Sequence, residues 1–299
     1  MAEVSRASES KPGNSIRGAG DPSEATSSLA GESLKSTSLA QPDDPCLLLE
    51  VTANPTRPNW SNSAATTQCG VVEMDFGWQR QPMGGGVTQF LEPASIRYGL
   101  TPRLDLRWGL PVHMMQSGGG EPELNGATDQ WLSARYRFHE QGRVSPALAL
   151  SYGIKFPTAN PGKGFGSGYA DHQFTLIASR DVGHGHFDFN LAGTLAGGPV
   201  SEDGATQAGL VLSLPVTKRF SAMLESNGGS QPGIADRYGA ALVGGNWAWR
   251  PWMVLDVAYT RAYTAGTPRA QFTVGFTAAR RSGLPVLSRQ TRFARILGR

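Results

Sequence analysis

Histidine and aspartate side chains, both common metal ligands, crowd one short stretch, HGHFD at residues 184–188. No other ligand type clusters with His184, His186 and Asp188 in the sequence, so a turn with incidental histidines is the favoured interpretation. The stretch GKGFGSG at 162–168 resembles a phosphate-binding loop, but it lacks the GxxxxGK[ST] spacing and opens no predicted helix. We therefore expect no metal and no cofactor.

A second stretch, ESNGG at 225–229, resembles the His-x-Ser-Asn-Gly motif of the outer-membrane phospholipases, which are twelve-stranded barrels. In those enzymes a histidine activates the serine, but Leu224 stands at that position here. Without an imidazole, Ser226 has no evident base to remove its proton. No catalytic residue is therefore predicted, and an esterase or phospholipase-like barrel remains an alternative.

Alternation of apolar and polar side chains along the sequence predicts the β-strands that would carry these residues. In RLDLRWGLPVH at 103–113, Leu104, Leu106, Trp108 and Leu110 fall on one side of a zigzag, with Asp105 and Arg107 on the other. A period of two is that of a β-strand whose two faces meet different surroundings. It recurs in about twelve segments of roughly ten residues, the length that a tilted strand needs to cross a bilayer. These segments are 71–79, 89–99, 103–112, 129–139, 145–156, 171–181, 186–196, 206–215, 221–228, 238–249, 253–263 and 270–278.

The connections between these segments alternate in length. Short turns at 100–103, 140–143, 182–185, 216–219 and 250–252 alternate with long polar loops at 80–88, 113–128, 157–170, 197–205, 229–237 and 264–269. Short turns on one rim and long loops on the other are typical of bacterial outer-membrane barrels. We predict an all-β fold, a single closed antiparallel transmembrane β-barrel of about twelve strands, with short periplasmic turns and long extracellular loops. A soluble β-sandwich or a closed soluble barrel is the weaker alternative.

Aromatic residues near the segment ends fit the two interfacial girdles of such a barrel. Those beside the short turns are Tyr98, Phe138, Phe187, Phe220, Trp249 and Trp252, and those beside the long loops are Trp78, Phe90, Trp131, Phe156 and Tyr263. Leu104, Leu106, Trp108 and Leu110 are predicted to face lipid.

Charged residues then fall on the lumen side, where water or a counter-charge can accommodate them. The candidate lumen-lining residues are Glu73, Asp75, Arg97, Asp105, Arg107, Arg135, Arg137, Lys155, Asp188, Glu225 and Asp256. Ion pairs that only stabilise the wall are as good an interpretation of any single one of them as a role in binding solute.

Composition sets the remaining limits. The 299 residues carry a formal charge of +3, and the last twenty contribute much of the excess, including Arg289, Arg292 and Arg295. This tail has one aromatic residue, Phe293, so no nucleic-acid partner is predicted. The only cysteines, Cys46 and Cys69, precede the first strand and do not support a disulfide framework.

Three regions follow from these patterns. Residues 1–52 form a predicted disordered N-terminal segment, 53–279 the outer-membrane barrel, and 280–299 a basic C-terminal tail. The first 44 residues lack the apolar run of a secretory signal, which argues against export. The strand pattern nevertheless predicts the bacterial outer membrane as the location and its lipid as a partner.

Several runs also resemble one family of barrels. PASIRYGLTPRLDLRWGL (93–110), the stretches 133–142 and 186–197, and above all KFPTANPGKGFGSGYAD within 146–183 are similar to the barrels known as putative MetA-pathway of phenol degradation proteins. The resemblance covers about residues 53–278 and implies passage of small aromatic compounds, with no catalytic residues to carry over. The chain departs from the family in lacking a signal peptide and in extending about twenty residues beyond the last strand.

The function predicted from the sequence is a channel or transporter for small apolar or aromatic solutes, without covalent chemistry. Twelve strands give a bore between those of filled eight-stranded barrels and open porins, so the path is expected to be narrow. A structural barrel that transports nothing is a further alternative.

Overall fold

The computed structural model describes residues 46, 50–120, 122–198, 205–231, 234–264 and 269–287. Most of the predicted N-terminal segment and the last twelve residues of the predicted tail lie outside them. Every described residue belongs to one compact unit within residues 42–299.

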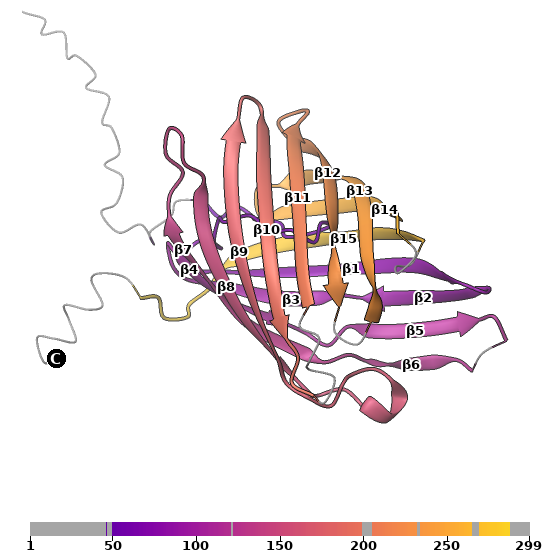
Figure 1. Cartoon of the computed structure of the whole chain (residues 1–299). Coiled ribbons are helices and arrows are strands. Elements are labelled where there is room, and N and C mark those ends of the chain that lie inside the picture. The colour runs from indigo at the N-terminus through magenta and orange to yellow at the C-terminus, as the bar shows by residue number, and fades with distance from the viewer. Residues whose placement is uncertain are drawn as a thin grey trace, which may run out of the picture. The chain divides into compact units, whose positions relative to one another are not determined.

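The described chain is built from antiparallel strands joined in chain order (Figure 1). The strands are β1 (Val71–Gly84), β2 (Val87–Glu92), β3 (Ala94–Thr101), β4 (Leu104–Gly109), β5 (His113–Gly118), β6 (Leu124–Ala127), β7 (Gln130–His139), β8 (Ala147–Phe156), β9 (Asp171–Val182), β10 (Gly185–Leu195), β11 (Ala205–Pro215), β12 (Phe220–Gln231), β13 (Ile234–Arg250), β14 (Met253–Ala262) and β15 (Ala270–Arg281). One 3₁₀ turn, η1 (Pro161–Lys163), lies in the loop after β8.

Three of the breaks between these elements are kinks within a single strand. Pro93 separates β2 from β3, residues 110–112 separate β4 from β5, and residues 128–129 separate β6 from β7. Backbone hydrogen bonds continue across them, from Gly77 N to Pro93 O and from Leu110 N to Ala94 O. The elements therefore form twelve strands, and pairing of β15 with β1 closes the sheet into a barrel. The predicted fold class and strand number are confirmed.

Short turns gather on one rim, as predicted, but the opposite rim differs in detail. The predicted loop at 80–88 is a tight hairpin turn, because Gly84, Gly85 and Gly86 adopt positive φ angles and let β1 and β2 run on to it. The predicted loop at 113–128 contains the hairpin of β5 and β6. At the other end of the sequence, β15 runs to Arg281, two residues beyond the predicted barrel.

The outer face of the barrel is apolar over the middle of its strands. Large exposed side chains there include Leu132, Leu150, Leu176, Leu191, Leu210, Val243 and Val257. An apolar surface of this extent requires lipid rather than water around it. No helix among the described residues is long and apolar enough to cross a bilayer.

Leu176 and Thr175 provide a test of the two faces, because they are neighbours near the middle of β9. Leu176 is exposed on the outside, whereas Thr175 borders a cavity inside the barrel. Leu176→Arg should lower the free energy of unfolding by about 2–4 kcal/mol, the cost of a charge near the bilayer midplane. Thr175→Arg should cost much less. Urea titrations of refolding into lipid vesicles would measure both, and equal losses would contradict the assignment of the faces.

Candidate functional site in the barrel lumen

A segment that precedes the first strand occupies the lumen. Residues 54–67 form no strand in the wall, and their backbone and side chains bind polar groups that point inward from at least six strands. Ala53 N also donates to Pro251 O, and Thr66 Oγ1 donates to Pro102 O, so the segment lies toward the rim with the short turns. We call residues 54–67 the lumen segment.

The sequence prediction assigned residues from 53 onward to the barrel itself, and nothing in it anticipated a lumen segment. The stretch has no alternation, and its asparagine, proline, serine and threonine residues are also typical of a loop. Its position follows only from contacts with residues far away in the sequence.

A disulfide joins Cys46 to Cys69. The sequence does not support a disulfide framework, and it did not anticipate this single bond, which flanks the lumen segment. A disulfide suits an oxidising compartment such as the bacterial periplasm.

Arg97 is a buried arginine that contacts two buried carboxylates and the lumen segment. Its guanidinium lies 2.8 Å from a carboxylate oxygen of Glu73 and 3.0 Å from one of Asp75, and it donates to Asn54 O of the lumen segment at 2.7 Å. All three charged side chains are at most 2% exposed. Asp75 also accepts from Thr277 at 2.6 Å, so its carboxylate is held from β3, β15 and the lumen segment.

Other predicted lumen residues bind the lumen segment directly. Arg135 donates to Asp105 at 2.5 Å and to Ser63 O at 2.8 Å. Glu225 accepts from the backbone N–H groups of Trp60 and Ser61 at 2.9 and 2.7 Å.

Asp256 pairs with Arg57 at 3.4 Å, and Arg57 also donates to Thr273 at 2.7 Å. Sequence reasoning missed Arg57, because it lies outside every alternating segment. It is nevertheless an arginine of the lumen segment that is only 8% exposed.

The remaining candidates lie nearer the rims. Lys155 pairs with Asp171 at 2.5 Å and with Asp129 at 3.5 Å, toward the long loops. Arg137 pairs with Glu140 beside a short turn.

Asp188 accepts from Ser179 at 2.5 Å and contacts His186, which also contacts Asp181. Among the described residues, no group of three or more histidine, cysteine, aspartate or glutamate side chains is arranged to hold a metal ion.

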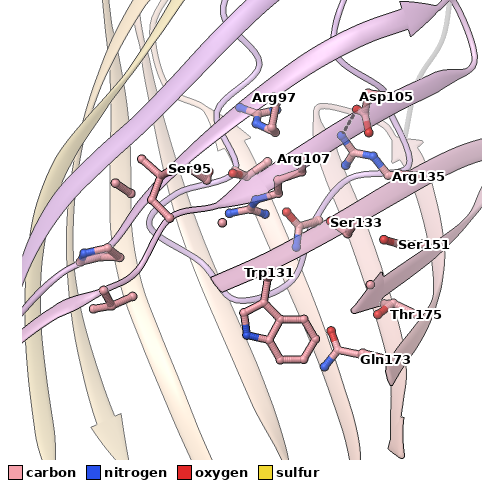
Figure 2. A pocket seen from close by; sticks show the side chains of 18 of the residues that line it. Ser95, Arg97, Asp105, Arg107, Trp131, Ser133, Arg135, Ser151, Gln173 and Thr175 are labelled. Atoms are coloured by element: carbon pink, nitrogen blue, oxygen red, sulfur yellow. Dashed lines mark hydrogen bonds and ion pairs between the residues drawn. The ribbon is translucent and has the colours of Figure 1, made fainter. Parts of the chain in front are cut away.

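Two cavities lie on either side of the lumen segment. One, of about 350 Å³, is bordered by Arg97, Arg107 and Arg135 and by neutral residues of β7 to β9 (Figure 2). The other, of about 410 Å³, is bordered by residues of the short-turn end such as Lys218 and Arg219. Thr56 and Asn62 border both cavities, so the lumen segment is a thin partition between them. We call the first the upper cavity and the second the lower cavity.

Two residues that were predicted to face the membrane border the upper cavity instead. Trp131 is predicted to lie in an aromatic girdle. It is separated from Ser133 and Arg135 by two and four positions on β7, so its side chain is on the same face of the strand and points inward (Figure 2). Leu110 was assigned to lipid, but β4 ends at Gly109 and the kink before Pro111 turns Leu110 toward the cavity. By contrast Leu106 and Trp108 are exposed on the outside, as predicted.

The serine of the ESNGG motif faces outward and lies beside a tyrosine. Ser226 is exposed on the outer side of β12, and its hydroxyl lies 3.2 Å from the Tyr263 hydroxyl. Glu225, its neighbour, points the other way and binds the lumen segment. The geometry therefore gives no support to the esterase alternative.

The fold is that of twelve-stranded outer-membrane barrels. It is similar to the crystal structure of the COG4313 outer membrane channel from Pseudomonas putida F1, with a TM-score of 0.60 and 14% identity over 76% of this chain and 100% of that chain. Weaker likenesses are to the KdgM porin, with a TM-score of 0.49, 8% identity and coverage of 69% and 98%, and to the NanC porin, with a TM-score of 0.47 and the same identity and coverage. No family model and no curated protein matches the sequence.

The class is therefore an outer-membrane β-barrel, with lipid around its apolar belt and a polar interior.

Proposed function

We propose that the protein is a narrow outer-membrane channel for small solutes of the apolar or aromatic kind, and that the lumen segment limits passage. The observation that carries this proposal is the polar lumen, which holds two cavities that share Thr56 and Asn62 of the lumen segment in their walls. A barrel whose sole task is structural needs no such cavities, since side chains can fill a small barrel completely.

Two further observations support a small solute. Twelve strands enclose a bore intermediate between filled barrels and open porins, and the lumen segment narrows it further. The sequence resemblance to the MetA-pathway barrels favours aromatic compounds, and the COG4313 structure with the same fold is described as a channel. Among the described residues, the Ser226 hydroxyl contacts the Tyr263 hydroxyl, which does not support the esterase alternative.

Solute flux tests the proposal. Liposomes that contain the refolded protein should swell faster in phenol-sized neutral aromatics and organic acids than in large sugars, because the narrow bore sets a size limit. Empty liposomes and liposomes that contain an open porin are the controls. Swelling no faster than that of empty liposomes for every solute would support a purely structural barrel. Ester hydrolysis that is lost in Ser226→Ala would instead restore the enzyme alternative.

A further inference from the structure

Most of the charged side chains that border the upper cavity are paired with another described residue, but one is not. Three arginines and two aspartates border the cavity, and four of these five groups are already paired. Arg97 binds Glu73 and Asp75, Arg135 binds Asp105, and Asp129 lies near Lys155 and accepts from Ala159 N at 2.9 Å.

Arg107 is the exception. Within the part of the chain that the structure describes, its guanidinium makes no hydrogen bond and no ion pair with another residue, although Asp75, Asp105, Arg97 and Arg135 are all near enough to act on its charge. Figure 2 shows Arg107 at the cavity, between Arg97 and Ser133. A guanidinium has five N–H donors in a planar fork that matches a carboxylate. Its donors are therefore available to a molecule in the cavity.

The wall around Arg107 has two kinds of surface. Ser133, Ser151 and Thr175 supply hydroxyl groups, and Gln173 supplies an amide whose nitrogen donates to Thr194. Trp131, Leu110, Val112, Pro93 and Ile177 supply apolar surface. A site with a few polar groups and an apolar wall in a cavity of this size is typical of small-molecule sites.

We propose that the upper cavity binds small organic acids that carry one carboxylate on a ring or a short apolar body. The carboxylate accepts two hydrogen bonds from Arg107, and the body packs against Trp131 and Leu110. This inference rests on the proposed function and names the class of solute that the channel selects.

A carboxylate suits the cavity better than a cation. The two aspartates of the wall are already held, Asp105 by Arg135 and Asp129 beside Lys155, so a cation would have to compete with those partners. An anion meets an arginine whose donors are unused by the described residues.

Binding can be measured apart from transport. The full-length protein in detergent would be titrated by calorimetry with benzoate and, as the neutral probe of the same shape, benzyl alcohol. Benzoate should bind at least about tenfold more tightly, because hydrogen bonds to charged groups are among the strong ones. Arg107→Gln should remove this preference, and Arg107→Lys should restore part of it. Trp131→Ala should weaken both probes by a similar factor.

Arg103→Gln is the matched control, because Arg103 lies just before β4, is half exposed and pairs with Glu140 at the turn outside the cavity. It should bind benzoate as the native protein does. Heat modifiability on a gel verifies that each variant folds. If Arg107→Gln does not fold, the proposal is tested by the preference of the native protein for benzoate over benzyl alcohol and by the affinities of Trp131→Ala for the two probes.

Equal affinity for the two probes in the native protein, or an unchanged preference in folded Arg107→Gln, would overturn the proposal. Flux of small solutes without any such preference would overturn it and leave the channel function intact. Preferential benzoate binding without flux would support the site and contradict the channel.

Discussion

Removal of the lumen segment is expected to raise the conductance of the barrel several-fold. The variant would lack residues 54–67 and carry Cys46→Ser and Cys69→Ser, so that neither the segment nor its disulfide link remains. The expectation follows from the position of Thr56 and Asn62, which border both cavities, because their removal joins the two cavities into one path. Conductance depends strongly on the narrowest part of a pore. Single channels in planar lipid bilayers would measure the change.

The double variant Cys46→Ser, Cys69→Ser is the matched control. It leaves the lumen segment's hydrogen bonds in place, including those from Trp60 and Ser61 to Glu225 and from Thr67 N to Asp105 at 2.8 Å. Its conductance should therefore stay close to that of the native protein. If the deletion conducted no better than this control, the lumen segment would not be the constriction.

Loss of Arg97 should produce the largest loss of stability. Arg97→Met would leave Glu73 and Asp75 buried without the cation that lies within 3.0 Å of both. Breaking a buried ion pair by removing one partner typically costs about 3–5 kcal/mol, because an uncompensated charge remains. The lumen segment would also lose the hydrogen bond from Arg97 to Asn54 O. Urea-induced unfolding in lipid vesicles, followed by tryptophan fluorescence, would measure the loss.

Two variants show whether charge is the cause. Glu140→Gln removes a half-exposed acid that pairs with Arg103 and Arg137 at a turn, and it should cost no more than about 1 kcal/mol. Combining Arg97→Met with Glu73→Gln and Asp75→Asn removes the stranded charges and should recover much of the stability. A loss in the triple variant equal to that of Arg97→Met alone would show that packing, rather than charge, accounts for the effect.

The deletion of the lumen segment and Arg97→Met both disturb one network of polar contacts inside the barrel. The ion pairs of the wall and the lumen segment share partners, since Asp75, Asp105 and Arg135 each bind both another wall residue and the segment. The charges that the sequence suggests as a lining for solute are thus largely used to hold the segment. Among the charged residues that border the upper cavity, Arg107 alone has no partner within the described residues, and for this reason it carries the proposed site.

The sequence by itself determined the barrel. The period of two defines the strands, the short turns define one rim, and the exposed row of Leu106 and Trp108 against buried Asp105 follows directly from alternation. These features are local, because a strand has only two faces and a lipid-facing row cannot carry charge.

Alternation along the strand could also have placed the Trp131 side chain in the lumen. It has the same parity as Arg135, so it had to face the lumen once Arg135 did. Leu110 could not be placed in this way, because the kink at Pro111 interrupts the alternation.

Only the tertiary structure decided what fills the lumen. The lumen segment has no periodicity, and its anchors Glu225, Asn190 and Ser179 lie more than a hundred residues away along the chain. Arg57 pairs with Asp256, which lies 199 positions further along the chain, and no local sequence pattern predicts this pair. Such contacts depend on closure of the barrel, which brings the inner faces of all its strands around one axis. A pattern that is read along the chain specifies which side of a strand is polar, but not which polar groups meet across the lumen.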